Sequence, residues 1–173
     1  LPDGRTFLEA VVAGVRAADP ALVTVVVGPW WGTDPADATP EGCSVVVNPD
    51  PDRGQITSIR TAFAAAGIGW SGVLVALVDH PAVRPETFAA IAAVHAEDPE
   101  SILVPVTTGD GGLVRRGHPV IFPEWSFPDL LGPATDVGGA REVLRAWPRR
   151  VREIPTVDVG IVGTVVVDGD AEA

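Results

Sequence analysis

Two carboxylates stand where apolar runs of the sequence end. Asp79 closes GVLVALVD (72–79), and Asp168 follows the last apolar run in VVVDGDAEA (165–173). Carboxylate oxygens suit Mg²⁺, which uses one or two of them together with substrate phosphates. Two alternatives stay open from the residues alone. Asp79 can cap the turn that follows it, and Asp168, with Asp170 beside it, can belong to a solvated acidic tail.

Histidines and a proline accompany these carboxylates. Pro81 lacks a backbone donor and bends the chain away, which leaves the carboxylate of Asp79 at the rim of a sheet. His80 is interpreted as an orienting or packing residue, because Mg²⁺ prefers oxygen ligands. In RRGHP, Gly117 permits a turn and His118 can hydrogen-bond a ligand. A structural loop histidine is the simpler interpretation of His118 from the residues alone.

A second polar group lies where a loop meets a helix. Gly54, Gln55, Thr57 and Ser58 start the segment GQITSIRTAF. Free backbone N–H groups at a helix start suit a phosphate oxygen. Ordinary N-capping by the same residues is the competing interpretation.

Strand-like and helix-like segments alternate in a way that can position these groups. Helical spacing predicts helices over 5–18, 55–67 and 84–97, and apolar runs predict strands over 22–28, 44–48, 72–79 and 101–106. Units of this kind indicate βαβ crossovers and a mostly parallel sheet in a single domain, residues 1–173. Ligands of such sheets bind at the carboxyl ends of the strands. The later residues predict an extended segment within 109–122, a helix over 138–147, and apolar runs over 151–156 and 160–173.

Composition restricts the classes of function. The chain has 173 residues, a net charge of −11 and 46% hydrophobic residues. The charge argues against a nucleic-acid binder, which needs a basic stripe. No apolar run approaches the roughly 20 residues of a membrane span, and the first residues do not resemble a signal peptide. A single cysteine, Cys43, fits a reducing compartment, so a cytoplasmic location is expected.

Four segments together resemble one family. LVALVDHPAVRPETF (74–88) resembles the Asp-x-Pro segment of the MobA-like nucleotidyltransferases, and within them the molybdenum cofactor cytidylyltransferase branch. LPDGRTFLEAVVAGVRAA (1–18), VVNPDPDRGQITSIRTAF (46–63) and RRGHPVIFPEWSFPDLL (115–131) resemble further segments of that family in the same order. The resemblance extends over about residues 1 to 155.

The resemblance implies a fold, a reaction and a set of site residues. It implies an α/β, Rossmann-like, glycosyltransferase-A-type three-layer sandwich with a mostly parallel sheet. It implies transfer of CMP from CTP, with Mg²⁺, to the phosphate of a molybdopterin-type cofactor, with release of pyrophosphate. Asp79 matches the catalytic, metal-binding aspartate, and Asp168, with Asp170 as a competitor, matches the second metal ligand. The implied substrate-binding residues are Asn48, Gly54, Gln55, Thr57, Ser58, His80, Pro81, Gly117 and His118.

The sequence departs from the family pattern at both ends. The family's first strand and its glycine-rich nucleotide loop would precede Leu1, so we expect a chain that lacks them. VVVDGDAEA also lacks the Thr-Pro of the C-terminal family motif. The alternative expectation is therefore a non-catalytic protein that binds a pterin or assists the maturation of a molybdoenzyme partner.

Overall fold

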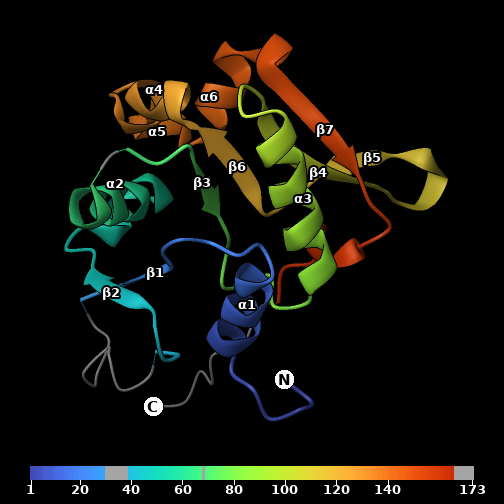
Figure 1. Cartoon of the computed structure of the whole chain (residues 1–173), viewed down its shortest axis with the longest axis horizontal. Helices are drawn as coiled ribbons and strands as arrows, with labels where there is room; N and C mark the ends of the chain where they lie inside the picture. Colours follow the sequence, from blue (N-terminus) through green and yellow to red (C-terminus); the bar gives the residue numbers. More distant parts are fainter. Residues whose placement is uncertain (30–38, 68, 166–173) are drawn as a thin grey trace.

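Helices cover both faces of a sheet in the computed structural model, which describes residues 1–29, 39–67 and 69–165 (Figure 1). The helices are α1 (Phe7–Arg16), α2 (Gln55–Ala66), α3 (Pro85–Glu97), α4 (Phe127–Leu131), α5 (Thr135–Gly138) and α6 (Arg141–Ala146). The strands are β1 (Thr24–Val27), β2 (Ser44–Val47), β3 (Gly72–Val75), β4 (Ile102–Thr108), β5 (Val114–Arg116), β6 (Val120–Pro123) and β7 (Val151–Pro155). A short 3₁₀ helix, η5 (Val159–Val162), follows β7.

Local sequence signals account for the helix that begins the chain. Thr6 and Glu9 form a capping box, in which each side chain accepts a hydrogen bond from the backbone N–H of the other. The buried stripe of α1 faces α3. Gly14 permits the close approach, because a Cβ there would lie 2.5 Å from the ring of Phe88. This contact fixes α3, whose first turn borders the candidate site.

The larger sheet has the order β3-β6-β4-β5, with β7 also paired to β4. Only the pairing of β4 with β7 is parallel, and β3–β6, β4–β6 and β4–β5 are antiparallel. The expectation of a mostly parallel sheet is therefore wrong. The chain returns from β4 into β5 through a short loop without a crossover helix, and such short connections join antiparallel neighbours.

Alternating side chains of the sheet define three layers. Ile102, Val104 and Phe122 pack with α2, α4 and α6 on one face. Leu103 and Ile121 point to the other face and pack with α3. This period-two alternation is the one expected for strands buried on both sides. The three-layer α/β arrangement agrees with the fold predicted by the resemblance.

Two strand edges stay unpaired in the part of the chain that the structure describes. There β1 pairs only with β2, in parallel, and β3 pairs only with β6. All four residues of β3 are only half-buried, although this strand belongs to the longest apolar run. The free backbone N–H and C=O groups of an unpaired strand edge can pair with another strand. The additional strand that the resemblance expects stays a prediction, and these edges are compatible with it.

Three expected elements have different ends. The strand predicted over 72–79 ends at Val75, where its pairing with β6 ends. The helix predicted over 138–147 begins only at Arg141, as α6, because Gly139, whose φ of 67° is not helical, separates it from α5. The apolar run 160–173 begins inside η5, and its residues from 166 on, with Asp168 and Asp170, lie outside the described residues.

Candidate functional site

Asp79 lies in a turn four residues beyond β3. The backbone N–H of His80 donates to the carbonyl of Leu77 at 3.2 Å, which closes the turn. The side chain of Asp79 is 44% exposed, and its Oδ1 lies 4.0 Å from Nε2 of His80. Within the described residues this is the only ion-pair contact of the carboxylate. Asp79 therefore offers oxygen lone pairs to a ligand from the carboxyl side of β3.

His80 and His118 form an edge-to-face pair of rings beside Asp79. Their ring centroids are 5.5 Å apart, and the rings meet edge to face at 64°. His80 is 8% exposed, and neither Nδ1 atom has a hydrogen-bond partner among the described residues. Burial lowers the pKa of His118, and the backbone carbonyl of Val75 acts in the opposite direction. The structure thus brings together two predicted residues that are 38 positions apart, as mostly buried rings.

The segment Asp158–Val165, which we name the C-terminal clamp, joins the loops of these residues. The backbone N–H of His118 donates to the carbonyl of Ile161 at 2.9 Å, and that of Val165 donates to the carbonyl of Asp79 at 2.9 Å. A Cβ on Gly117 would lie 2.1 Å from the carbonyl oxygen of Ile161. Gly117 is therefore a close-packing position, where the clamp leaves no room for a side chain.

Sequence reasoning missed Asp158, which is 3% exposed at the start of the clamp. Its carboxylate accepts hydrogen bonds from the backbone N–H of Arg84 and the hydroxyl of Thr87, at 2.8 and 2.6 Å. It also accepts one from the N–H of Gly160 at 2.9 Å. The only local signal is the Asp-x-Gly turn, because the bonds to α3 cross more than 70 residues of sequence.

The polar group at the start of α2 is a closed network. Asn48 is 1% exposed, and its amide nitrogen donates to the hydroxyl oxygens of Thr57 and Ser58 at 2.8 and 3.0 Å. The hydroxyl of Thr57 is within hydrogen-bond distance of the carbonyls of Gly54 and Asp50. Asn48 and Thr57 therefore hold the loop to the helix.

The remaining predicted residues of this loop face solvent. Gly54 takes a φ of 97°, which favours glycine, and it gives α2 no side-chain cap. Gln55 is exposed. These residues follow β2, whereas Asp79 follows β3 in the other sheet. The structure thus places the two sets of predicted residues beyond different strands.

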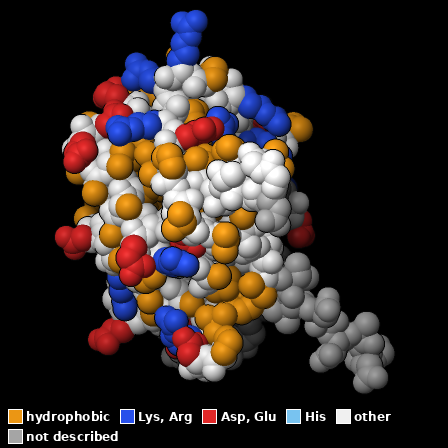
Figure 2. All heavy atoms as spheres, turned by 90° about the vertical axis from the view of Figure 1, so that its right-hand side faces the viewer, with side chains coloured by type: hydrophobic (Ala, Val, Ile, Leu, Met, Phe, Trp, Pro, Cys, Tyr) orange, Lys and Arg blue, Asp and Glu red, His pale blue; other side chains and the backbone are white. Residues whose placement is uncertain are grey.

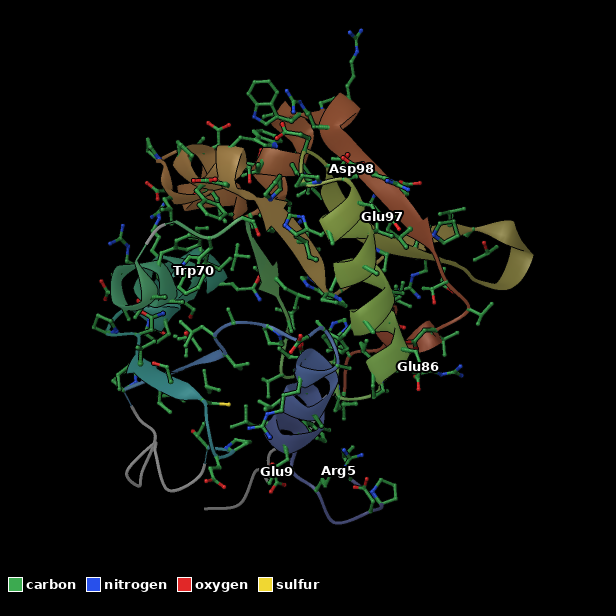
Figure 3. All side chains as sticks on the ribbon, viewed as in Figure 1. Arg5, Glu9, Trp70, Glu86, Glu97 and Asp98 are labelled. Atoms are coloured by element: carbon green, nitrogen blue, oxygen red, sulfur yellow. The ribbon has the colours of Figure 1, made fainter. Side chains whose placement is uncertain are left out.

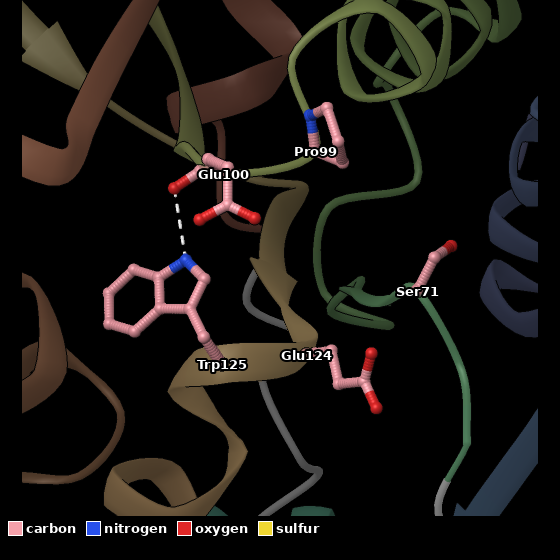
Figure 4. A pocket seen from close by; sticks show the side chains of 5 residues that line it. All are labelled: Ser71, Pro99, Glu100, Glu124 and Trp125. Carbon is pink, nitrogen blue, oxygen red and sulfur yellow. Dashed lines mark hydrogen bonds between the residues drawn. The ribbon is translucent and has the colours of Figure 1, made fainter.

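A cavity of about 280 Å³ lies away from Asp79. It is lined by Ser71, Pro99, Glu100, Glu124 and Trp125, at the opposite, amino-terminal end of β3 (Figure 4). The indole N–H of Trp125 donates to the carbonyl of Glu100. The Cζ atom of Arg150 lies 5.0 Å from the centroid of the Trp125 ring, and the guanidinium pairs with the carboxylate of Glu100. The ring and the carboxylate are therefore already in contact with a cation of the chain.

Arginines at this end are largely paired with acidic residues. Arg152 pairs with Asp98, and Arg150 pairs with Glu100. Figure 2 shows blue and red side chains side by side at the upper end of the molecule. The segment RAWPRRVRE (145–153) thus forms an exposed helix end and the entry to β7. No helix of the described residues is both long enough and apolar enough to span a bilayer.

The sequence model of the MobA-like NTP transferase domain matches residues 1–152. The chain belongs to this family. This MobA-like chain is also 28% identical over 145 residues to nicotine blue oxidoreductase of Paenarthrobacter nicotinovorans, a match that covers 84% of the chain and 71% of that protein.

Solved structures agree with the family. Rv0371c from Mycobacterium tuberculosis H37Rv is 26% identical, with a TM-score of 0.71 over 87% of this MobA-like chain and 74% of that one. A structure of Rv0371c in complex with manganese aligns with a TM-score of 0.65 over 90% of the chain and 82% of that one, at 25% identity. The 2-C-methyl-D-erythritol 4-phosphate cytidylyltransferase of Thermus thermophilus shares the fold, with a TM-score of 0.67 over 95% and 84% of the two chains at 19% identity.

The donor chemistry around Asp79 fits a hard divalent cation in part. The exposed carboxylate supplies oxygen ligands, which Mg²⁺ and Mn²⁺ both accept. Within the described residues no group of three or more His, Cys, Asp or Glu side chains could hold a metal ion. The described part of this MobA-like chain therefore contributes one carboxylate, and further ligands would be waters, substrate phosphates or residues beyond 165.

Proposed function

We propose that the protein transfers CMP from CTP to the phosphate of a molybdopterin-type cofactor. Membership of the MobA-like NTP transferase family supports nucleotidyl transfer. The resemblance of DHP and RGHPVIF to the cytidylyltransferase branch supports CTP and the pterin. The observation that carries the proposal is the exposed Asp79 carboxylate, held beyond β3 by loops that resemble the family's site.

The proposed reaction is an in-line substitution at phosphorus. An oxygen of the acceptor phosphate forms a bond to the α-phosphorus of CTP, the bond from that phosphorus to the bridging oxygen breaks, and pyrophosphate leaves. When bound at Asp79, a divalent cation supplies neutralisation of the phosphate charge. The protein then has to position the two substrates and to exclude water.

Asp168 is proposed as a second metal ligand, with Asp170 as the competing candidate. The backbone N–H of Val165 donates to the carbonyl of Asp79 at 2.9 Å. Asp168 follows three residues later, and three residues of chain reach at most about 10 Å. The length of chain therefore permits this assignment, which rests on the resemblance.

Two polar side chains, the exposed Gln55 and the half-buried Ser58, are proposed to contact substrate from the α2 side. Gln55 is exposed at the start of the helix. Ser58 accepts a hydrogen bond from Asn48 and can still donate its own hydroxyl proton. By contrast, Asn48, Thr57, His80, Pro81, Gly117 and His118 are proposed to shape the site more than to bind ligand directly, because the structure buries or internally bonds them.

The second candidate is a non-catalytic protein that binds a pterin or assists a molybdoenzyme. The similarity to nicotine blue oxidoreductase favours keeping it, because that relative is not named as a transferase. The missing Thr-Pro after Asp168 favours it as well.

Pyrophosphate release separates the two candidates. The protein, expressed from its natural start, would be assayed with Mg²⁺ and molybdopterin against CTP, GTP and ATP in turn. Release that needs molybdopterin and prefers CTP supports the proposal. Pterin binding without pyrophosphate release from any nucleotide supports the second candidate, and release that prefers GTP contradicts the assignment of the base.

A further inference from the structure

A buried carboxylate controls three contacts around the candidate site. Asp158 bonds to the first turn of α3 through Arg84 and Thr87 and to its own turn through Gly160. Both oxygens of the carboxylate accept hydrogen bonds from the chain, and the residue is 3% exposed, so its polar contacts among the described residues are all within the protein. Through these bonds Asp158 holds the start of the C-terminal clamp against the first turn of α3.

The clamp contacts the loop 79–84 at three separate points. Asp158 contacts the end of the loop at the N–H of Arg84. In the middle, Gly160 lies so close that a Cβ would be 2.3 Å from the carbonyl oxygen of Ala82. At the start of the loop, the N–H of Val165 bonds to the carbonyl of Asp79.

The centre of the clamp is fixed in the core. Ile161 is 0% exposed and packs with Val83 and Phe88, and its carbonyl accepts the N–H of His118. Close-packed segments of this kind move as units and transmit strain. A shift at Asp158 therefore shifts both the Asp79 turn and the His118 loop.

We infer that Asp158 is a positioning residue for Asp79, acting through the clamp at a distance. The inference rests on the proposed function in one respect, since it takes Asp79 as a ligand of a divalent cation. The neutral Asp158→Asn variant would replace one oxygen acceptor with an N–H group that faces another donor. The donors that faced the replaced oxygen would then lack an acceptor, and the clamp would settle in a different place.

The test measures Mn²⁺ binding by electron paramagnetic resonance and amide exchange by NMR, at a temperature where every variant is folded. Asp158→Asn is expected to weaken Mn²⁺ binding about tenfold, as outer partners of metal ligands do. The amides of His118 and Val165 are expected to exchange faster. Thr87→Val should show the same effects more weakly, and Thr87→Ser, which keeps the hydroxyl, should restore the wild-type values.

Asp98→Asn is the matched control. Asp98 follows the other end of α3, where it bonds to Ser101 and Arg152 (Figure 3). It is expected to lower stability while it leaves Mn²⁺ affinity and the exchange of His118 and Val165 unchanged.

Two outcomes overturn the inference. In one, Asp158→Asn and Asp98→Asn lower the melting temperature alike and neither changes Mn²⁺ affinity, which would make Asp158 a purely structural residue. In the other, Asp158→Asn leaves the exchange of the Val165 amide unchanged. Absence of Mn²⁺ binding by the wild-type protein would instead count against the proposed metal role, and the exchange measurement would still decide whether Asp158 positions Asp79.

Discussion

Asn48→Ala tests whether the network at the start of α2 is structural. The side chain is 1% exposed and makes three hydrogen bonds: two donated by its amide and one accepted from the N–H of Asp50. Each contributes about 1 kcal/mol net, so the substitution should lower the free energy of unfolding by about 3 kcal/mol. For a domain of this size that corresponds to a fall of about 6–12 °C in melting temperature.

Urea unfolding followed by circular dichroism measures this effect. Gln55→Ala is the matched control in the same loop, because Gln55 is exposed, and it should change stability by no more than about 0.5 kcal/mol. At a pH where its carboxyl is protonated, Asn48→Asp keeps the acceptor and one O–H donor in place of the two amide donors, so it should fall between the wild type and Asn48→Ala. A loss below about 1 kcal/mol for Asn48→Ala would refute the structural interpretation and return Asn48 to the substrate-binding set.

Three further changes follow from the packing and the charges. Gly117→Ala should destabilise the fold or displace the clamp, because its Cβ would lie 2.1 Å from the carbonyl oxygen of Ile161; an unchanged melting temperature would contradict this. Arg60→Ala removes hydrogen bonds to three residues of segment 132–136 and should cost about 2 kcal/mol in urea unfolding. Burial lowers the pKa of His118 below 6.5, so the unfolded chain binds the proton more tightly, and stability should fall as pH drops through 6.5 toward the folded pKa. Urea titrations across that range should show a weaker fall for His118→Asn.

Local signals predicted most helices because their ends depend on nearby residues. Helix α3 begins at Pro85, a residue suited to a first turn, and α2 ends before Gly67, whose φ is 75°. The later start of α6, at Arg141, was missed, since a Gly-Gly pair can lie within a helix or break it. Tertiary contacts then determine whether the helix continues through the two glycines.

Strand direction could not be predicted from the apolar pattern. The extended segment expected within 109–122 forms β5 and β6, which both pair with β4 in the antiparallel sense. The period-two pattern of a strand is the same in both directions, so only the connection reveals the direction. The loop from β4 to β5 was the relevant signal.

Motifs predicted residues of the candidate site that lie together in the structure, whereas contacts between distant segments could not be predicted. The resemblance gathered Asp79, His80 and His118, and the structure places them beside one another. Asp158 gave no comparable signal. The helical pattern over 84–97 also suggests a solvated surface position for His95, but both of its ring nitrogens are buried and burial lowers its pKa.

The most direct test of the central claim compares the wild-type protein with Asp79→Asn in CTP-dependent pyrophosphate release with Mg²⁺ and molybdopterin. Glu97→Gln, which removes an exposed carboxylate at the end of α3 (Figure 3), is the control for loss of charge. The account predicts loss of release in Asp79→Asn, with a wild-type circular dichroism spectrum, and full release in Glu97→Gln. Wild-type release by a folded Asp79→Asn protein would contradict the account.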